Sequence, residues 1–212
     1  MELEMAKSVL KKQLQIEVLM RHTSSRISCL VVDGSTVIYT IHWPVNGTVN
    51  DYIDTFKSFI GQKLNQCDVY LVFDRYMSYS TKSVTRSGRQ SNVSKVYQLT
   101  CDMTIPRQNV TLGVTENKRQ LISLICSELC TNSYFHQLYT NTHKLTVTGE
   151  GNVPTQIHKG IIIDRVDLKT THEEADIMII QQMIDAVHEG HTGVAVLSDD
   201  TYVFVLLIYY HV

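Results

Sequence analysis

The sequence lacks the features that mark zinc-binding, membrane-spanning and secreted proteins. Its five cysteines are odd in number and include no C-x₂-C pair, so we expect reduced thiols and no zinc site. The longest apolar run, residues 203–208, is far too short to span a bilayer. Residues 1–20 contain no apolar signal-peptide core. These absences predict an intracellular protein, nuclear or cytoplasmic, with no membrane partner.

Signatures of several other functions are missing as well. The sequence contains no G-x-G-x-x-G and no P-loop lysine, which argues against a nucleotide-binding domain of Rossmann type. Ser35 and Thr36 stand beside Asp33 without forming a nucleophile elbow, so acyl transfer has no support. The formal net charge of −2 gives no overall basic field. Any contact with nucleic acid must therefore come from a local patch.

Strand-like and helix-like segments alternate along the 212 residues, which predicts an α/β fold with a well-buried core. Apolar runs at 27–33 and 68–74 frame a helical pattern that starts with a capping box at Thr48 and Asp51. This strand–helix–strand unit indicates a parallel sheet. We expect further strands at 144–147, 160–164, 194–198 and 203–208, and further helices at 116–130 and after a second capping box, Thr171 to Glu174.

We expect an N-terminal helical extension over residues 1–26 and a single domain over residues 27–212. Residues 75–115 show no clear period, and we interpret them as a basic, irregular insertion. The sequence stops directly after an apolar run, whereas a parallel sheet normally covers its last strand with a further helix. We therefore expect a C-terminally truncated version of a longer domain.

Acidic residues follow the apolar runs at the points where strands should end. Asp33 and Asp74 end the first two runs, Asp200 follows the run at 194–198, and Glu174 and Asp176 open a helical stretch. The carboxyl ends of parallel strands meet at one edge of a sheet, so these carboxylates should gather there. They would repel one another unless cations lay between them. Ligands that are all oxygen suit Mg²⁺ or Mn²⁺, which predicts a metal site of the kind that cuts phosphodiesters.

Each of these acids also has a purely structural interpretation. Asp33 could act as a turn acid or helix N-cap before Gly34. Glu174 could close a capping box with Thr171, and Asp176 in the first turn would favour the helix dipole. These roles stay open beside metal ligation.

A stretch of positive charge follows the second acid. Residues 75–101 contain five Lys or Arg side chains and no acid, which suits phosphate contacts. Lys82, Arg86 and Arg89 would share one face if the segment were helical, but its helix propensity is poor. A solvated loop is the alternative interpretation.

The order of these blocks resembles the PIN-like superfamily, in its flap-endonuclease branch of structure-specific 5′ nucleases. The resemblance is closest to uncharacterised, mobile-element-associated animal PIN-like proteins. It spans roughly residues 27–208. Four blocks carry it: Val31-Val32-Asp33-Gly34-Ser35, Val72-Phe73-Asp74, Glu173-Glu174-Ala175-Asp176, and Ser198-Asp199-Asp200-Thr201-Tyr202-Val203. A fifth element, Lys82-Ser83 with Arg89, resembles the basic residues with which flap endonucleases steer the scissile phosphate.

The resemblance implies a three-layer α/β/α sandwich with a mainly parallel central sheet and a two-metal Mg²⁺ or Mn²⁺ site. The implied ligands and catalytic residues are Asp33, Asp74, Glu174, Asp176 and Asp200. One departure matters, because the family's Asp-x-Asp block reads Asp200-Thr201-Tyr202 here. A neutral phenol is a poor ligand for hard cations, so one metal position should be weakened. Asp199 would point to the opposite face if it lay in a strand.

We therefore expect metal-dependent hydrolysis of DNA or RNA by a flap-endonuclease-type site, weakened by Tyr202. Lys82, Arg86 and Arg89 would contact the nucleic acid, and no obligatory protein partner is evident. The alternative is a catalytically degenerate PIN-like fold that binds nucleic acid or another partner. Tyr202 favours the alternative, whereas the remaining acids and the basic stretch favour the enzyme.

Overall fold

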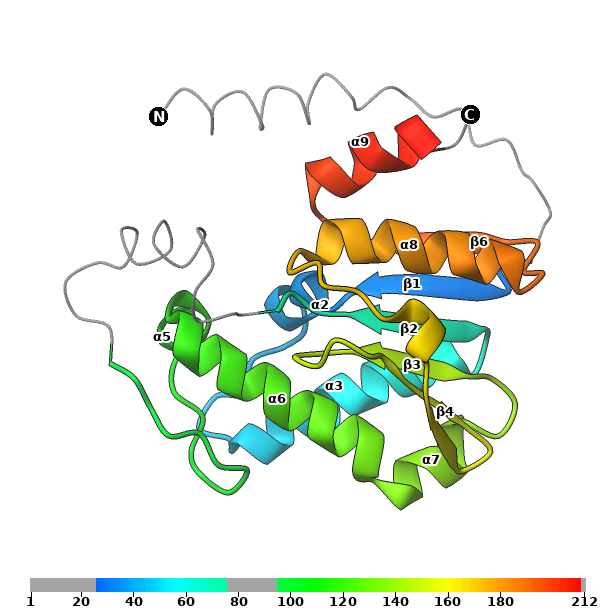
Figure 1. The fold of residues 1–212 in the computed structure, drawn as a ribbon. Coiled ribbons are helices and arrows are strands. Elements are labelled where there is room, and N and C mark those ends of the chain that lie inside the picture. Colours follow the sequence, from blue (N-terminus) through cyan, green and yellow to red (C-terminus); the bar gives the residue numbers. More distant parts are fainter. Residues whose placement is uncertain (1–25, 76–94, 211–212) are drawn as a thin grey trace, which may run out of the picture.

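A computed structural model describes residues 26–75 and 95–210, which form a six-stranded sheet flanked by helices (Figure 1). The strand order is β5-β4-β3-β2-β1-β6. The strands are β1 (Cys29–Asp33), β2 (Asp68–Val72), β3 (Leu145–Thr148), β4 (Thr155–His158), β5 (Ile161–Asp164) and β6 (Val194–Leu197). Residues 1–25 of the expected N-terminal helical extension, and Lys82, Arg86 and Arg89, lie outside the described ranges.

The central strands run parallel, as the sequence predicted. β1 pairs with β2 on one side, with Asp33 opposite Val72, and with β6 on the other, with Val32 opposite Leu197. β3 extends the parallel part beyond β2, and β4 and β5 add an antiparallel hairpin at the far edge. The fold is therefore α/β with a mixed, mainly parallel sheet.

Helices cover both faces of this sheet and give three layers (Figure 1). One face packs on α2 (Gly34–Thr40), α3 (Val49–Leu64), α6 (Thr115–Thr131) and α7 (Ser133–Tyr139), and the other on α8 (Ala175–His188) and α9 (Thr201–Tyr210). Alternate strand residues supply the two cores: Val32 and Leu71 belong to the first, and Val31 and Tyr70 to the second. This period of two lets one buried strand serve both layers.

The crossover helices change face where the strand order reverses. The connections from β1 to β2 and from β2 to β3 contain α3 and α6, which lie on the first face. The connection from β5 back to β6 contains α8 on the second face. From β1, the sheet is therefore extended on one side by β2 to β5 and on the other side by β6. In open α/β sheets such a switch point leaves a crevice at the carboxyl ends of the strands, where ligands bind.

The capping box predicted before α3 is present. Thr48 Oγ1 accepts a hydrogen bond from the Asp51 amide (3.2 Å), and Asp51 Oδ2 accepts one from the Thr48 amide (2.7 Å). The helix buries Tyr52, Phe56 and Ile60 against the first face. The capping box predicted at Thr171 is wrong, because α8 begins at Ala175 with Glu174 as an N-cap that makes no side-chain capping bond.

Three secondary-structure predictions need correction. Residues 203–208, expected as a strand, belong to α9, because an uninterrupted apolar run has no period that separates helix from strand. Neither the strand β4 nor the helix α7 was among the expected elements. Within the stretch interpreted as irregular, α5 (Gln108–Gly113) is helical. All five cysteines are free thiols, and no helix of residues 26–75 or 95–210 is long and apolar enough to cross a bilayer.

Gly34, which follows Asp33, allows a close approach between α2 and the end of β2. A Cβ at this position would lie 2.3 Å from Cε1 of Phe73, a fully buried ring. We expect Gly34→Ala to lower the free energy of unfolding by about 1–3 kcal/mol, because the ring must shift in a packed core. Urea denaturation measures the loss. Gly113→Ala is the control, since a Cβ there meets no atom within 4 Å; an equal loss in both variants would contradict the packing argument.

Candidate metal centre

Asp33, the last residue of β1, is fixed by four hydrogen bonds. Its Oδ1 accepts from the amides of Ser35 (2.8 Å) and Thr36 (3.3 Å), which makes it the N-cap of α2. Its Oδ2 accepts from the hydroxyls of Thr36 (2.9 Å) and Ser198 (3.0 Å). The structural role considered for Asp33 is therefore real, and it aims the carboxylate at the end of the neighbouring strand β6.

Ser198 connects Asp33 with Asp200. The hydroxyl that donates to Asp33 also accepts a hydrogen bond from the Asp200 amide (3.1 Å). Oδ1 of Asp200 in turn accepts from the amide of Tyr202 (2.8 Å) at the start of α9. The acids that follow β1 and β6 thus lie at the same edge of the sheet, as their sequence positions predicted.

Asp74 is joined to the start of α8 in a similar way. Its Oδ1 accepts a hydrogen bond from the Ala175 amide (3.0 Å), between Glu174 and Asp176. The amide of Arg75 donates to the carbonyl of Glu173 (2.8 Å). Asp74 and the start of α8, which carries Glu174 and Asp176, are therefore brought together although 101 residues separate Asp74 from Ala175.

Electrostatics links these two pairs. The pKa of Asp176 is raised to about 6, first by burial and then by the carboxylates of Asp200, Asp74, Asp33 and Glu174. Carboxylates raise the pKa of a neighbouring carboxyl only when they lie near enough for their charges to interact. All five acids predicted from the sequence therefore belong to one electrostatic cluster at the switch point of the sheet.

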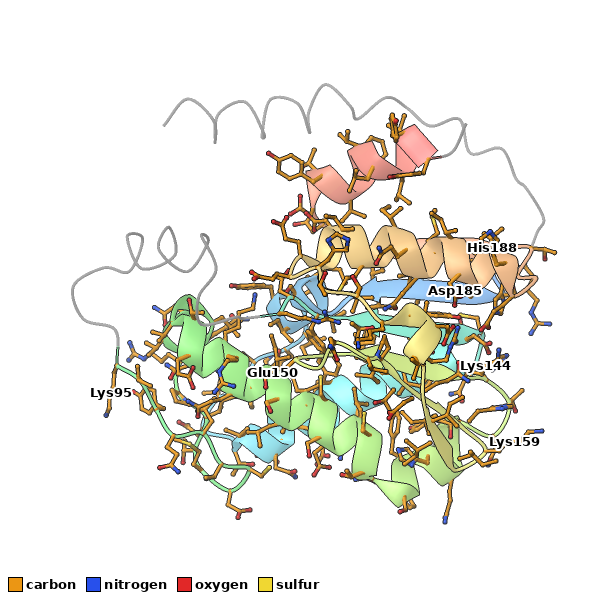
Figure 2. The ribbon with its side chains drawn as sticks, in the orientation of Figure 1. Lys95, Lys144, Glu150, Lys159, Asp185 and His188 are labelled. Atoms are coloured by element: carbon orange, nitrogen blue, oxygen red, sulfur yellow. The ribbon has the colours of Figure 1, made fainter. Side chains whose placement is uncertain are left out.

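Four of these five acids have no ion-pair partner within the described ranges. Asp33, Asp74, Asp176 and Asp200 form no ion pair with a lysine, arginine or histidine of the described ranges. At the opposite end of the strands, away from α2, the acids do have cationic partners; Lys144 and Asp185 are labelled there (Figure 2). Lys144 pairs with Glu189 at 2.9 Å, and Arg165 pairs with Asp185 at 2.9 Å.

The side chains as they stand do not form a closed coordination shell. Among residues 26–75 and 95–210, no three His, Cys, Asp or Glu side chains are arranged to hold a metal ion. The hydrogen bonds explain why, since Asp33, Asp74 and Asp200 each direct an oxygen at a backbone amide. The chemistry of the donors nevertheless fits, because all five acids offer carboxylate oxygens, the ligands that suit Mg²⁺ or Mn²⁺. No hydrogen bond from the described residues to Asp176 would compete with an ion.

Tyr202 and Asp199 do not lie where a strand would place them. β6 ends at Leu197, and Tyr202 lies in the first turn of α9 with 53% of its surface exposed. Asp199 is exposed, and its amide donates to Thr36 Oγ1 (2.9 Å). The expectation that strand pleating would turn Asp199 away from Asp200 is therefore wrong, because the pleat has ended.

The structure adds residues that the sequence did not single out. A hollow of about 240 Å³ beside Asp33 and Asp200 is also lined by Ser35, Thr36 and Tyr39. Burial and the Asp74 carboxylate raise the pKa of Tyr39. On α6, Lys118 lies with its Nζ 3.3 Å from Ser35 Oγ and 5.2 Å from the centroid of the Tyr39 ring. Tyr39 and Lys118 belong to no motif or run of charge in the sequence, so no sequence signal could have identified them.

Comparisons with protein-family models, with curated proteins and with solved structures give no match to this chain. The interpretation therefore depends on the geometry of the site.

The raised pKa of Asp176 makes a prediction for stability without metal. An ordinary aspartate ionises near 3.8, whereas folded Asp176 keeps its proton to about pH 6. Because the folded state binds the extra proton, stability falls as pH rises through this window. Asp176→Asn removes that loss. Urea unfolding in EDTA should show the variant gaining about 1–2 kcal/mol on wild type between pH 4 and pH 7, an amount discounted for partial exposure. A difference that does not change with pH would contradict the crowding of carboxylates.

Proposed function

We propose that this chain is a PIN-like, divalent-metal-dependent phosphodiesterase of flap-endonuclease type that acts on DNA or RNA. One observation carries the proposal: acids at or just beyond the ends of β1, β2 and β6 and at the start of α8 form a cluster at the switch point, and Asp33, Asp74, Asp176 and Asp200 form no ion pair within the described ranges. A structural protein gains nothing from such crowding, because like charges in a partly buried site destabilise the fold. Divalent cations would convert the repulsion into attraction.

The residues divide into two supporting groups around such a site. Asp33 and Asp200 would hold an ion from one side, with Ser198 and Thr36 fixing the orientation of Asp33. Asp74, Glu174 and Asp176 would hold an ion from the other side, on the framework of the α8 start. When bound, Mg²⁺ or Mn²⁺ lowers the pKa of a water nucleophile and stabilises charge on the leaving oxygen of a phosphodiester.

The substrate class follows from charge as well as from the resemblance. A cluster of acids repels a polyanion unless cations screen it, so productive binding needs basic side chains nearby. Lys82, Arg86 and Arg89 are the residues we propose for phosphate contacts, in the acid-free stretch that follows Asp74 and Arg75. This reaction would place the protein in the nucleus or cytoplasm, where its five free thiols stay reduced.

The second candidate function is a nucleic-acid-binding or interaction module without catalysis. It is favoured by Tyr202 in place of an acid and by carboxylates that point toward backbone amides. Two substitutions separate the candidates.

Asp33→Asn should abolish cleavage while the fold is kept. The amide oxygen can still accept from the Ser35 amide, and the hydroxyls of Thr36 and Ser198 can rotate to accept from the new NH₂ group. The negative charge that holds the ion is lost. We expect Mn²⁺-dependent cleavage of flap and single-stranded oligonucleotides to fall roughly 100-fold or more. Unchanged cleavage by a folded variant would contradict the metal-site assignment.

Tyr202→Asp should increase Mn²⁺-dependent cleavage, since it restores an acid two residues after Asp200. The exposed site at the start of α9 tolerates the change, because an acid in the first turn favours the helix dipole. A rate gain of about tenfold corresponds to about 1.4 kcal/mol of added stabilisation, within the range of one such interaction. Tyr202→Asn is the matched control, with a polar group but no charge. A folded Tyr202→Asp protein that cleaves no substrate would decide for the binding module.

A further inference from the structure

Arg75, the residue after Asp74, is almost completely buried, with 2% of its surface exposed. Its Nη1 donates hydrogen bonds to the carbonyl oxygens of Thr170 and His172, the latter at 3.2 Å. Its backbone amide donates to the carbonyl of Glu173 at 2.8 Å. One residue at the end of β2 thus holds three carbonyls of a segment far away in the sequence.

That segment leads directly into the candidate site. Residues 169–174 contain no helix or strand, and Thr171 and His172 are exposed. Glu174, which follows, makes no side-chain capping bond to α8. The contact of Asp74 with the Ala175 amide completes the attachment, so residues 74 and 75 bind the segment at four positions, residues 170, 172, 173 and 175.

We propose that Arg75 is a positioning residue, which fixes the segment 170–174 so that Glu174 and Asp176 face Asp33, Asp74 and Asp200. The expected consequence of this positioning, tighter binding of a metal ion, rests on the proposed function. The attachment of the segment itself stands independently of that function.

The energetics favour a positioning role over a contribution to stability. Arg75 has no acidic partner within the described ranges, and its Nε and Nη2 lack any hydrogen bond there. Burial lowers the pKa of the guanidinium, but an arginine stays charged at neutral pH. A buried charge with unsatisfied donors destabilises a fold relative to an apolar residue of similar size. The presence of Arg75 at this position is explained if its hydrogen bonds are needed to hold the segment 170–174 in place.

The geometry also requires arginine in particular. Two carbonyls separated by one residue accept from the same planar guanidinium, whose donors keep a fixed orientation. A lysine ammonium is a point charge on a flexible stem, so it can reach these oxygens without fixing their relative positions.

Arg165 provides a matched control within the same protein. It is also buried, with 8% exposed, but it pairs with Asp167 (2.7 Å), Asp185 (2.9 Å) and Glu189 (3.0 Å), away from the candidate site. Removing Arg165 should affect stability without affecting ion binding.

The experiment compares Arg75→Met, Arg75→Lys and Arg165→Met in the full chain by hydrogen exchange and by Mn²⁺ titration followed by electron paramagnetic resonance. For Arg75→Met we expect amides of residues 170–176 to exchange about tenfold faster, with the central strands still protected. We expect its Mn²⁺ dissociation constant to rise roughly 10- to 100-fold, the usual effect of losing a residue that orients ligands. Arg75→Lys should lie between wild type and Arg75→Met, and Arg165→Met should bind Mn²⁺ as wild type does.

Unchanged exchange of residues 170–176 in both Arg75 variants would overturn the positioning role. If the methionine variant does not fold, Arg75→Lys alone decides, because the same local increase in exchange is expected of it. A wild-type protein that binds no Mn²⁺ would overturn the proposed function, while faster local exchange in the Arg75 variants would still support the attachment of the segment. Equal loss of Mn²⁺ affinity in Arg165→Met and Arg75→Met would show a general stability effect and contradict the proposal.

Discussion

The parallel pairing of β6, β1 and β2 determines the rest of this structure. It places the carboxyl ends of three strands at one edge, and the reversal of strand order between β1 and β6 opens that edge. Asp33 is the last residue of β1, Asp74 lies shortly after the end of β2, and Asp200 lies shortly after the end of β6. The crossover through α8 then brings two more acids to the same place. Shifting any of these strands by one residue would break up the cluster and both cores.

Hydrogen bonds make the crowding tolerable in the absence of cations. Asp33 and Asp200 cap the starts of α2 and α9, and Asp74 binds an amide at the start of α8. Backbone donors at helix starts stabilise the charged form of a carboxylate. Asp176 accepts from no such donor in the described part of the chain, and it is the acid whose pKa is raised to about 6. The same carboxylates can therefore serve as caps and be recruited as ligands, so the two interpretations of these residues are compatible.

The sequence predicted what local patterns and strand order can determine. Apolar runs followed by acids located β1, β2 and β6 and brought Asp33, Asp74 and Asp200 to one edge. It failed at α9, where apolar residues on all sides leave no period, and at Thr171, where the segment before α8 is held instead through the carbonyls of Thr170 and His172 by Arg75. The bond from Ser198 to Asp33 spans 165 residues and joins uncharged and charged groups at no fixed spacing. Contacts of this kind depend on tertiary packing and leave no local signal.

Anomalous diffraction from crystals grown with Mn²⁺ tests the central claim most directly. The account predicts a peak at the carboxyl edge of the sheet, within coordination distance, roughly 2.0–2.3 Å, of oxygens from Asp176 and from at least one of Asp33, Asp74 and Asp200. A second, weaker peak toward Tyr202 would agree with a weakened second position. The absence of any Mn²⁺ peak at this edge, at ion concentrations that saturate ordinary carboxylate sites, would contradict the account.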